Sequence, residues 1–135
     1  MSIPTQEDAH LMVDLFKLRL DPFMQQSENW FITKFEAGSW EDVKVRYVEG
    51  STERRMISTV LGYWEMLGAL VDHNLLSEDL LFDALESMDL TWQRVKDWIP
   101  SARTEGSPDF WENVELLANK HAKWLYTRIP KSERP

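Results

Sequence analysis

Hydrophobic residues recur along most of the chain at steps of three and four, the spacing that places them on one face of an α-helix. The clearest stripe predicts a helix over residues 52–73, after which Asn74 can adopt the left-handed conformation that ends helices. The face is wide, as expected of a helix that touches several others. Its members are Ile57, Val60, Leu61, Trp64, Leu67 and Val71.

Two further helical patterns follow. One runs from Ser77, a candidate N-cap, to Pro100, with a kink expected near Asp89. Its apolar positions are Leu81, Leu85, Met88, Trp92, Val95 and Ile99. Residues 100–108 are rich in glycine, proline and serine and predict a loop. Ser107, followed by proline and aspartate, then predicts the start of the last helix.

The N-terminal part predicts shorter helices. Thr5 with Asp8 forms an acidic variant of the capping box ahead of an apolar stripe. That stripe contains Leu11, Leu15 and Leu18, widened by Met12 and Phe16. Pro22 interrupts it, and a second helix is expected over residues 22–37 with Gly38 as its stop. Ser39 caps a third segment, for which the alternation "VKVRYV" leaves a short strand open.

These patterns together predict an all-α protein. We expect a single-domain irregular bundle of five or six helices over residues 1–128, followed by a flexible polar tail at 129–135. The sequence contains no internal repeat and no low-complexity tract.

The amino-acid composition excludes several kinds of chemical site and binding partner. The chain has no cysteine, which excludes disulfides, thiolate metal sites and a cysteine nucleophile. Its net charge of -8 opposes general binding to nucleic acid. No apolar run is long enough to cross a bilayer, and the first residues lack the pattern of a signal peptide. We therefore expect a cytoplasmic protein.

Motifs for familiar catalytic centres are missing from the sequence. The glycines are scattered rather than clustered into a phosphate-binding loop, and no nucleophile elbow is present. Glu7 and His10 have the spacing found in dimetal sites, but no second copy of that motif exists. We predict no catalytic residue, no metal and no cofactor.

Glu65 lies inside the most apolar helix and raises a more specific question. Ser58, Gly62, Glu65 and Ala69 share one small and polar face of that helix. The face is either exposed to solvent or approached closely by another helix, from this chain or from a second subunit. A glycine inside a helix costs about 1 kcal/mol, which favours a packing reason for Gly62.

Charge is distributed unevenly. Asp79, Asp83 and Glu86 form an acidic stripe, whereas the last residues of the chain are mostly basic. The two patches are either solvated faces or complementary surfaces that meet across a subunit contact or recruit a charged partner. Arg103 and His121 are candidate ligand-binding residues, although His121 also suits a buried structural histidine.

Several segments resemble a bacterial family of small helical proteins that is catalogued only as a domain of unknown function. They are "ERRMISTVLGYWEMLGALVDHNLL", "LTWQRVKDWI" and "FWENVELLANKHAKWL", spanning roughly residues 53–125. The resemblance implies an all-helical fold and a bacterial or phage origin. It implies no catalytic residue, because the family has no assigned activity. Some relatives resemble membrane-tethered versions.

Three functions remain open at this point. The leading hypothesis is a non-enzymatic interaction or regulatory module that forms a homo-oligomer or binds a protein partner. The second is an enzyme or small-ligand binder with a pocket near residues 100–108 that uses Arg103, Glu105 or His121. The third is an acidic, phage-type inhibitor in which the 79–86 stripe mimics nucleic acid.

Overall fold

A computed structural model describes residues 3–85 and 88–135, and the described residues are helical with no strand. They form eight α-helices and one 3-10 turn, so the expected count of five or six is wrong. The helices are α1 (Gln6–Arg19), α2 (Pro22–Thr33), α3 (Trp40–Arg46), α4 (Thr52–Asp72), α5 (Glu78–Ala84), α6 (Met88–Val95), α7 (Ile99–Glu105) and α8 (Glu112–Thr127), followed by η1 (Lys131–Glu133).

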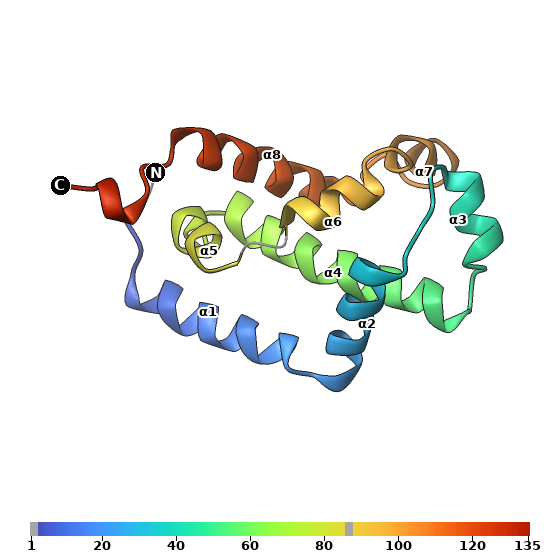
Figure 1. Ribbon diagram of the computed structural model, residues 1–135, viewed down its shortest axis with the longest axis horizontal. Coiled ribbons are helices and arrows are strands. Elements are labelled where there is room, and N and C mark those ends of the chain that lie inside the picture. The colour runs from blue at the N-terminus through green and yellow to red at the C-terminus, as the bar shows by residue number, and fades with distance from the viewer. Residues whose placement is uncertain (1–2, 86–87) are drawn as a thin grey trace.

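Helix α4 is the centre of the bundle. It packs most extensively on α8 and on α2, and Figure 1 shows it running between α8 on one side and α1 and α2 on the other. Leu61, Trp64 and Leu67 are buried in these contacts. Asn74 has a φ of 58° just beyond the helix, as the sequence predicts. Because α4 is buried on several sides, it fixes the relative positions of the other elements.

The long helix expected over residues 77–100 is wrong, since the chain breaks it into α5, α6 and part of α7. Leu85 leaves α5 in an extended conformation, and Pro100 lies in the first turn of α7. The predicted face nevertheless persists, because Leu81, Met88 and Val95 are all buried. Each break therefore keeps the apolar side turned toward the core.

Two predicted boundaries also need correction. Residues 99–105 form α7 rather than a loop, and Ser107 does not cap the last helix, which begins only at Glu112. A turn over 107–111 intervenes and ends at Trp111, whose φ is 55°. Helix α2 stops at Thr33, before the expected stop at Gly38.

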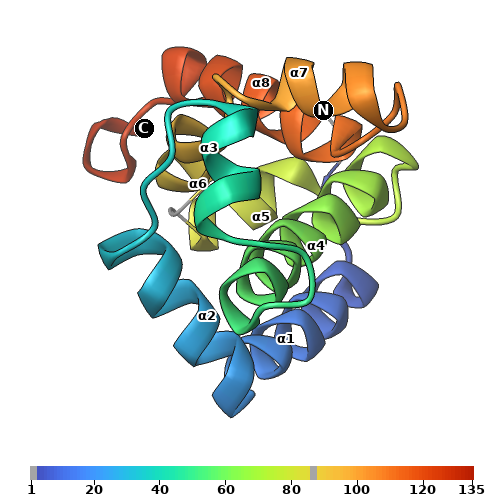
Figure 2. The same cartoon turned by 90° about the vertical axis from the view of Figure 1, so that its right-hand side faces the viewer.

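The short third segment is helical, not a strand. Ser39 accepts the backbone N–H of Asp42 at 3.1 Å, which starts α3 as the sequence predicts. Figure 2 shows α3 beside α7, at the end of the molecule that faces the viewer. The aromatic rings of Trp40 in α3 and Trp98 just before α7 stack with centroids 5.4 Å apart. This stack attaches α3 to the rest of the bundle.

Candidate functional site

The N-terminus of α8 receives its cap from another helix. Glu65 in α4 accepts hydrogen bonds through Oε1 from the backbone N–H groups of Asn113 and Val114, both at 3.0 Å. Its Oε2 accepts a third from the Asn113 side-chain amide at 2.9 Å. The first N–H groups of a helix lack partners within it, and the helix dipole favours a negative charge there. Glu65 is thus a half-buried acid held across a helix contact.

Gly68, one turn after Glu65, allows α4 and α8 to approach this closely. A Cβ at Gly68 would lie 2.3 Å from the backbone oxygen of Asn113, so a larger residue clashes with the chain itself. Sequence reasoning missed this position, because a second glycine in the same helix was its only signal. The predicted packing face consists of Ser58, Gly62, Glu65 and Ala69.

The other members of that face make no comparable contact. Apart from Gly62's chain neighbours and the backbone of its own helix, no atom of the described residues lies within 4 Å of a Cβ built on Gly62. Ser58 is exposed, whereas Ala69 is half-buried. A second subunit on Ser58 and Gly62 therefore stays a prediction.

His121 lies on the buried face of α8 and connects it to α6. Its Nδ1 is 2.9 Å from Oδ1 of Asp89, and its ring packs on that of Phe82 with centroids 4.9 Å apart. The His121 side chain is 4% exposed, whereas Asp89 is 55% exposed. This is the geometry of a core histidine held in orientation by a surface carboxylate.

Arg103 is committed to a different internal contact. Its Nε donates to the backbone oxygen of Phe110 at 2.8 Å, and its Nη1 pairs with Glu115 at 2.7 Å. These bonds hold the turn over 107–111 against the start of α8. The structure therefore does not bring Arg103 and His121 into a common site.

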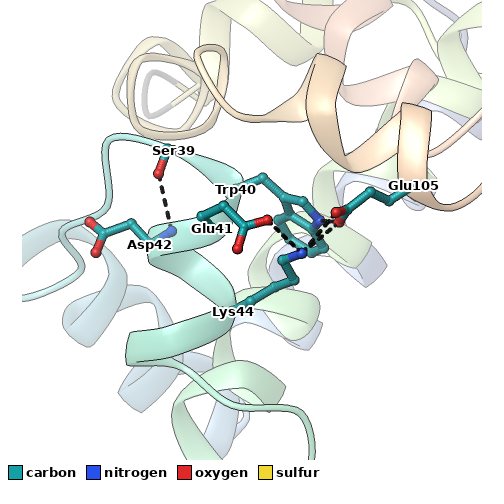
Figure 3. Close-up of polar contacts among 6 residues, drawn as sticks. All are labelled: Ser39, Trp40, Glu41, Asp42, Lys44 and Glu105. Carbon is teal, nitrogen blue, oxygen red and sulfur yellow. Dashed lines mark hydrogen bonds and ion pairs between the residues drawn. The ribbon is translucent and has the colours of Figure 1, made fainter.

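A polar cluster joins α3 to α7 (Figure 3). Lys44 Nζ contacts both carboxylate oxygens of Glu105, at 2.8 and 2.9 Å, and Glu41 at 2.8 Å. The indole N–H of Trp40 also donates to Glu105. The hydrogen bond that Lys44 donates to Glu105 raises the pKa of Lys44 and lowers the pKa of Glu105.

An open groove of about 340 Å³ lies beside this polar cluster, close to the segment where a ligand pocket was predicted. It is lined by Ser39, Trp40, Glu41, Ser101, Thr104 and Glu105. Glu105 thus borders the groove, whereas neither Arg103 nor His121 does. Because Lys44 and Trp40 both donate hydrogen bonds to Glu105, we interpret this cluster as a structural contact between α3 and α7.

The acidic stripe meets the basic C-terminal segment within the same chain. Asp79 accepts the indole N–H of Trp124 at 2.8 Å. Asp83 contacts Lys131 at 2.9 Å and Arg128 at 3.5 Å, and the hydrogen bond from Lys131 lowers the pKa of Asp83. Glu86 lies outside the described residues. The flexibility predicted for residues 129–135 stays a prediction, and the structure gives them one 3-10 turn.

Helix α1 presents an apolar face that sequence reasoning assigned to the core. Leu15 is its buried residue, while Leu11 and Met12 are partly buried. Phe16 and Leu18, both placed in the predicted core stripe, are 54% and 51% exposed. Val13 and Leu20 are exposed to a similar extent. The helix carries apolar residues on two sides, and periodicity alone did not indicate which side would be buried.

The described residues offer few other features that suggest chemistry. Across residues 3–85 and 88–135, no group of three or more histidine or acidic side chains could hold a metal ion. In the same part of the chain, none of the helices combines the length and apolar character needed to cross a membrane.

A family model described as a domain of unknown function, DUF4760, matches residues 4–124. The chain belongs to this family. The DUF4760 match confirms the resemblance inferred from sequence and extends it to α1, α2 and α3. It ends at Trp124, so the basic segment that contacts Asp83 lies beyond it. No curated protein and no solved structure matches this chain.

Proposed function

We propose that this DUF4760 protein is a non-enzymatic interaction module that self-associates through the outer face of α1. The observation that carries the proposal is the row of apolar side chains turned away from Leu15. Val13, Phe16 and Leu20 are 55%, 54% and 53% exposed, and with exposed Ala9 they make up what we term the α1 stripe. Contiguous exposed apolar patches are typical of surfaces that bind another protein.

The spacing of the α1 stripe fits a second copy of the same helix. Ala9, Val13, Phe16 and Leu20 follow at steps of four, three and four, which read the same in both directions. An antiparallel copy related by a two-fold axis would pair Val13 with Phe16 of the other chain, and Ala9 with Leu20. Such self-complementary contacts are the rule in symmetric dimers, and these steps match the seam of a coiled coil.

Charges beside the stripe support the same partner. Asp14 and Lys17 are both exposed and lie on the same side of α1, with Lys17 next to the stripe and Asp14 further round the helix. In the antiparallel arrangement, Lys17 of one chain approaches Asp14 of the other, and the two-fold axis repeats the pair. A single helix pair buries less surface than a standard interface, so we expect a dissociation constant of about 1–100 μM.

A charge exchange tests this arrangement. Asp14→Lys leaves two lysines beside the stripe, and Lys17→Asp leaves two aspartates, so each variant alone should dimerise less than the wild type. An equimolar mixture should form heterodimers, which sedimentation velocity detects as a return of the dimer peak. A mixture that sediments as the sum of the two separate variants contradicts the proposal.

The two other hypotheses have less support. The groove near α7 is open, and both Arg103 and His121 make internal contacts away from it. An inhibitor that mimics nucleic acid needs free carboxylates, whereas Asp79 and Asp83 contact Trp124, Arg128 and Lys131. A cytoplasmic setting in a bacterium belongs to the proposal as well.

A further inference from the structure

The surface between α5 and the end of α8, remote in sequence from the α1 stripe, holds a basic segment of the chain. Residues 128–134 form this C-terminal segment. Its Lys131 Nζ lies 2.9 Å from Oδ2 of Asp83, and Arg128 Nη2 lies 3.5 Å from Oδ1 of the same carboxylate. The Arg128 guanidinium carbon lies 4.8 Å from the centroid of the Trp124 ring.

This combination is the chemistry of a site for arginine or lysine side chains. A carboxylate pairs with a cation, and an indole face attracts it through the ring quadrupole. Asp79 fixes the indole by accepting its N–H at 2.8 Å. We use "the α5–α8 face" for Asp79, Asp83 and Trp124 together. The Asp79–Trp124 contact lies within the α5–α8 face and involves no residue of the C-terminal segment, whereas Asp83 contacts Lys131 and Arg128 of that segment.

The C-terminal segment fills this face poorly. Arg128 Nε is buried without a hydrogen-bond partner among the described residues, and its one ion pair is long. The Lys131 side chain is 62% exposed and Ile129 is 55% exposed, and every residue after Arg128 is exposed. Attachment therefore depends on ion pairs near solvent, which are weak and screened by salt. A segment held in this way can be displaced.

Space remains around the indole for a longer ligand. A groove of about 260 Å³ is lined by Asp79, Trp124 and parts of the C-terminal segment. Another of about 200 Å³ is lined by Trp124, Thr127, the acid Glu78 and the two bases Lys120 and Lys123. The segment also lies beyond the DUF4760 match, which ends at residue 124, whereas all three residues of the α5–α8 face lie within it. The face and its present occupant are thus separable parts of the chain.

We propose that the α5–α8 face is a docking site for an arginine- and lysine-containing segment of a partner protein, and that the C-terminal segment occupies it as an intramolecular competitor. The site goes beyond the proposed self-association, because it uses a different surface and a different kind of contact. Either one can fail without the other.

The test is a binding measurement on the full-length chain. A vacated variant carries Arg128→Ala, Lys131→Ala and Arg134→Ala, and a control variant carries Lys34→Ala, Arg55→Ala and Lys96→Ala, which changes the net charge equally at exposed positions. The probe is a fluorescein-labelled peptide with the sequence of residues 128–135, followed by anisotropy at low salt. We expect the vacated variant to bind it at least tenfold more tightly than both the wild type and the control.

Two further readings make the result specific. Adding Asp83→Lys to the vacated variant should abolish binding, and the indole N–H resonance of Trp124 in the vacated variant should shift at saturating peptide. Equal affinity of the vacated and control variants would overturn the proposal, because the gain would then be a net-charge effect. Binding that survives Asp83→Lys would overturn it too. Far-UV circular dichroism verifies that each variant is folded.

Discussion

Glu65 caps the helix that contains Asn113, although the two residues are 48 positions apart in the sequence. One carboxylate oxygen accepts the Asn113 backbone N–H at 3.0 Å, and the other accepts its side-chain amide at 2.9 Å. Gly68 lies one turn further along α4 and leaves room for the Asn113 backbone. The contact between α4 and α8 therefore combines a tertiary helix cap with a close backbone approach.

Replacing Glu65 should destabilise the protein without any catalytic consequence. Glu65→Ala leaves two half-buried backbone N–H groups unpaired, and we expect it to lower the free energy of unfolding by about 2 kcal/mol. Glu65→Gln keeps one acceptor oxygen but loses the charge, and should cost about 1 kcal/mol. Urea denaturation followed by tryptophan fluorescence measures both values.

Glu112→Gln is the matched control for this cap. Glu112 is an exposed acid in the first turn of the same helix. Its removal changes the charge near the helix dipole but breaks no backbone hydrogen bond, so the expected loss is smaller than that of Glu65→Gln. Equal losses for the two glutamine variants would show that charge alone, rather than the tertiary cap, stabilises α8.

The two glycines of α4 should respond to alanine with opposite signs. Alanine favours a helix over glycine by about 1 kcal/mol at either position. At Gly68 the added Cβ would lie 2.3 Å from a backbone oxygen, so overpacking should outweigh this gain and destabilise the protein by a net 1–2 kcal/mol, as an order of magnitude. At Gly62 the added Cβ would meet no atom of the described residues within 4 Å beyond its chain neighbours and its own helix backbone, so the gain should appear in full.

Thermal denaturation of the two alanine variants measures this difference. The melting temperature should fall for Gly68→Ala and rise for Gly62→Ala. A fall for Gly62→Ala would mean that a second subunit packs on that position, which is one of the alternatives that the sequence leaves open.

Tyr63 should make the protein less stable at alkaline pH. Burial raises the pKa of its hydroxyl group from 10.0 to about 12. Above pH 10 the unfolded chain therefore releases this proton while the folded chain keeps it, and stability declines until about pH 12. Two pKa units correspond to about 2–3 kcal/mol in total. Urea denaturation at a series of pH values between 8 and 12 measures this decline in stability.

Tyr63→Phe separates this effect from other alkaline titrations. The hydroxyl donates to the backbone oxygen of Leu15 at 2.9 Å, which ties α1 to α4, so the variant should lose about 1 kcal/mol at neutral pH. The difference from the wild type should then shrink and reverse as the pH rises beyond 10. A constant difference would contradict the assigned pKa.

Periodicity predicted which residues are buried better than it predicted where helices end. Leu81, Met88 and Val95 fall on one buried face as expected, yet the chain breaks twice between residue 78 and Pro100. Apolar spacing is insensitive to such breaks when each new helix resumes in phase. Within this segment the sequence predicts one helix with a kink near Asp89 and an end at Pro100.

Local capping signals failed where a tertiary contact replaced them. Ser107 and the proline after it have the composition of a helix start, but α8 begins five residues later, where Glu65 reaches its first N–H groups. When the capping carboxylate comes from a distant helix, the residues next to the capped helix carry no sequence signal of it. For the same reason, the pairing of Asp83 with Lys131 could be predicted only as complementary charge, not as a contact within one chain.

Self-association through the α1 stripe is the central claim, and the molar mass in solution tests it most directly. Light scattering coupled to size exclusion should give the wild type a mass that rises with loading from near the 16.0 kDa chain toward twice that value. Phe16→Glu places a charge in the stripe and should remain at the single-chain mass at every loading, whereas the control Val45→Glu, at an exposed position of α3, should behave like the wild type. A wild type that stays at the single-chain mass throughout, or a Phe16→Glu variant that dimerises equally well, would contradict the account.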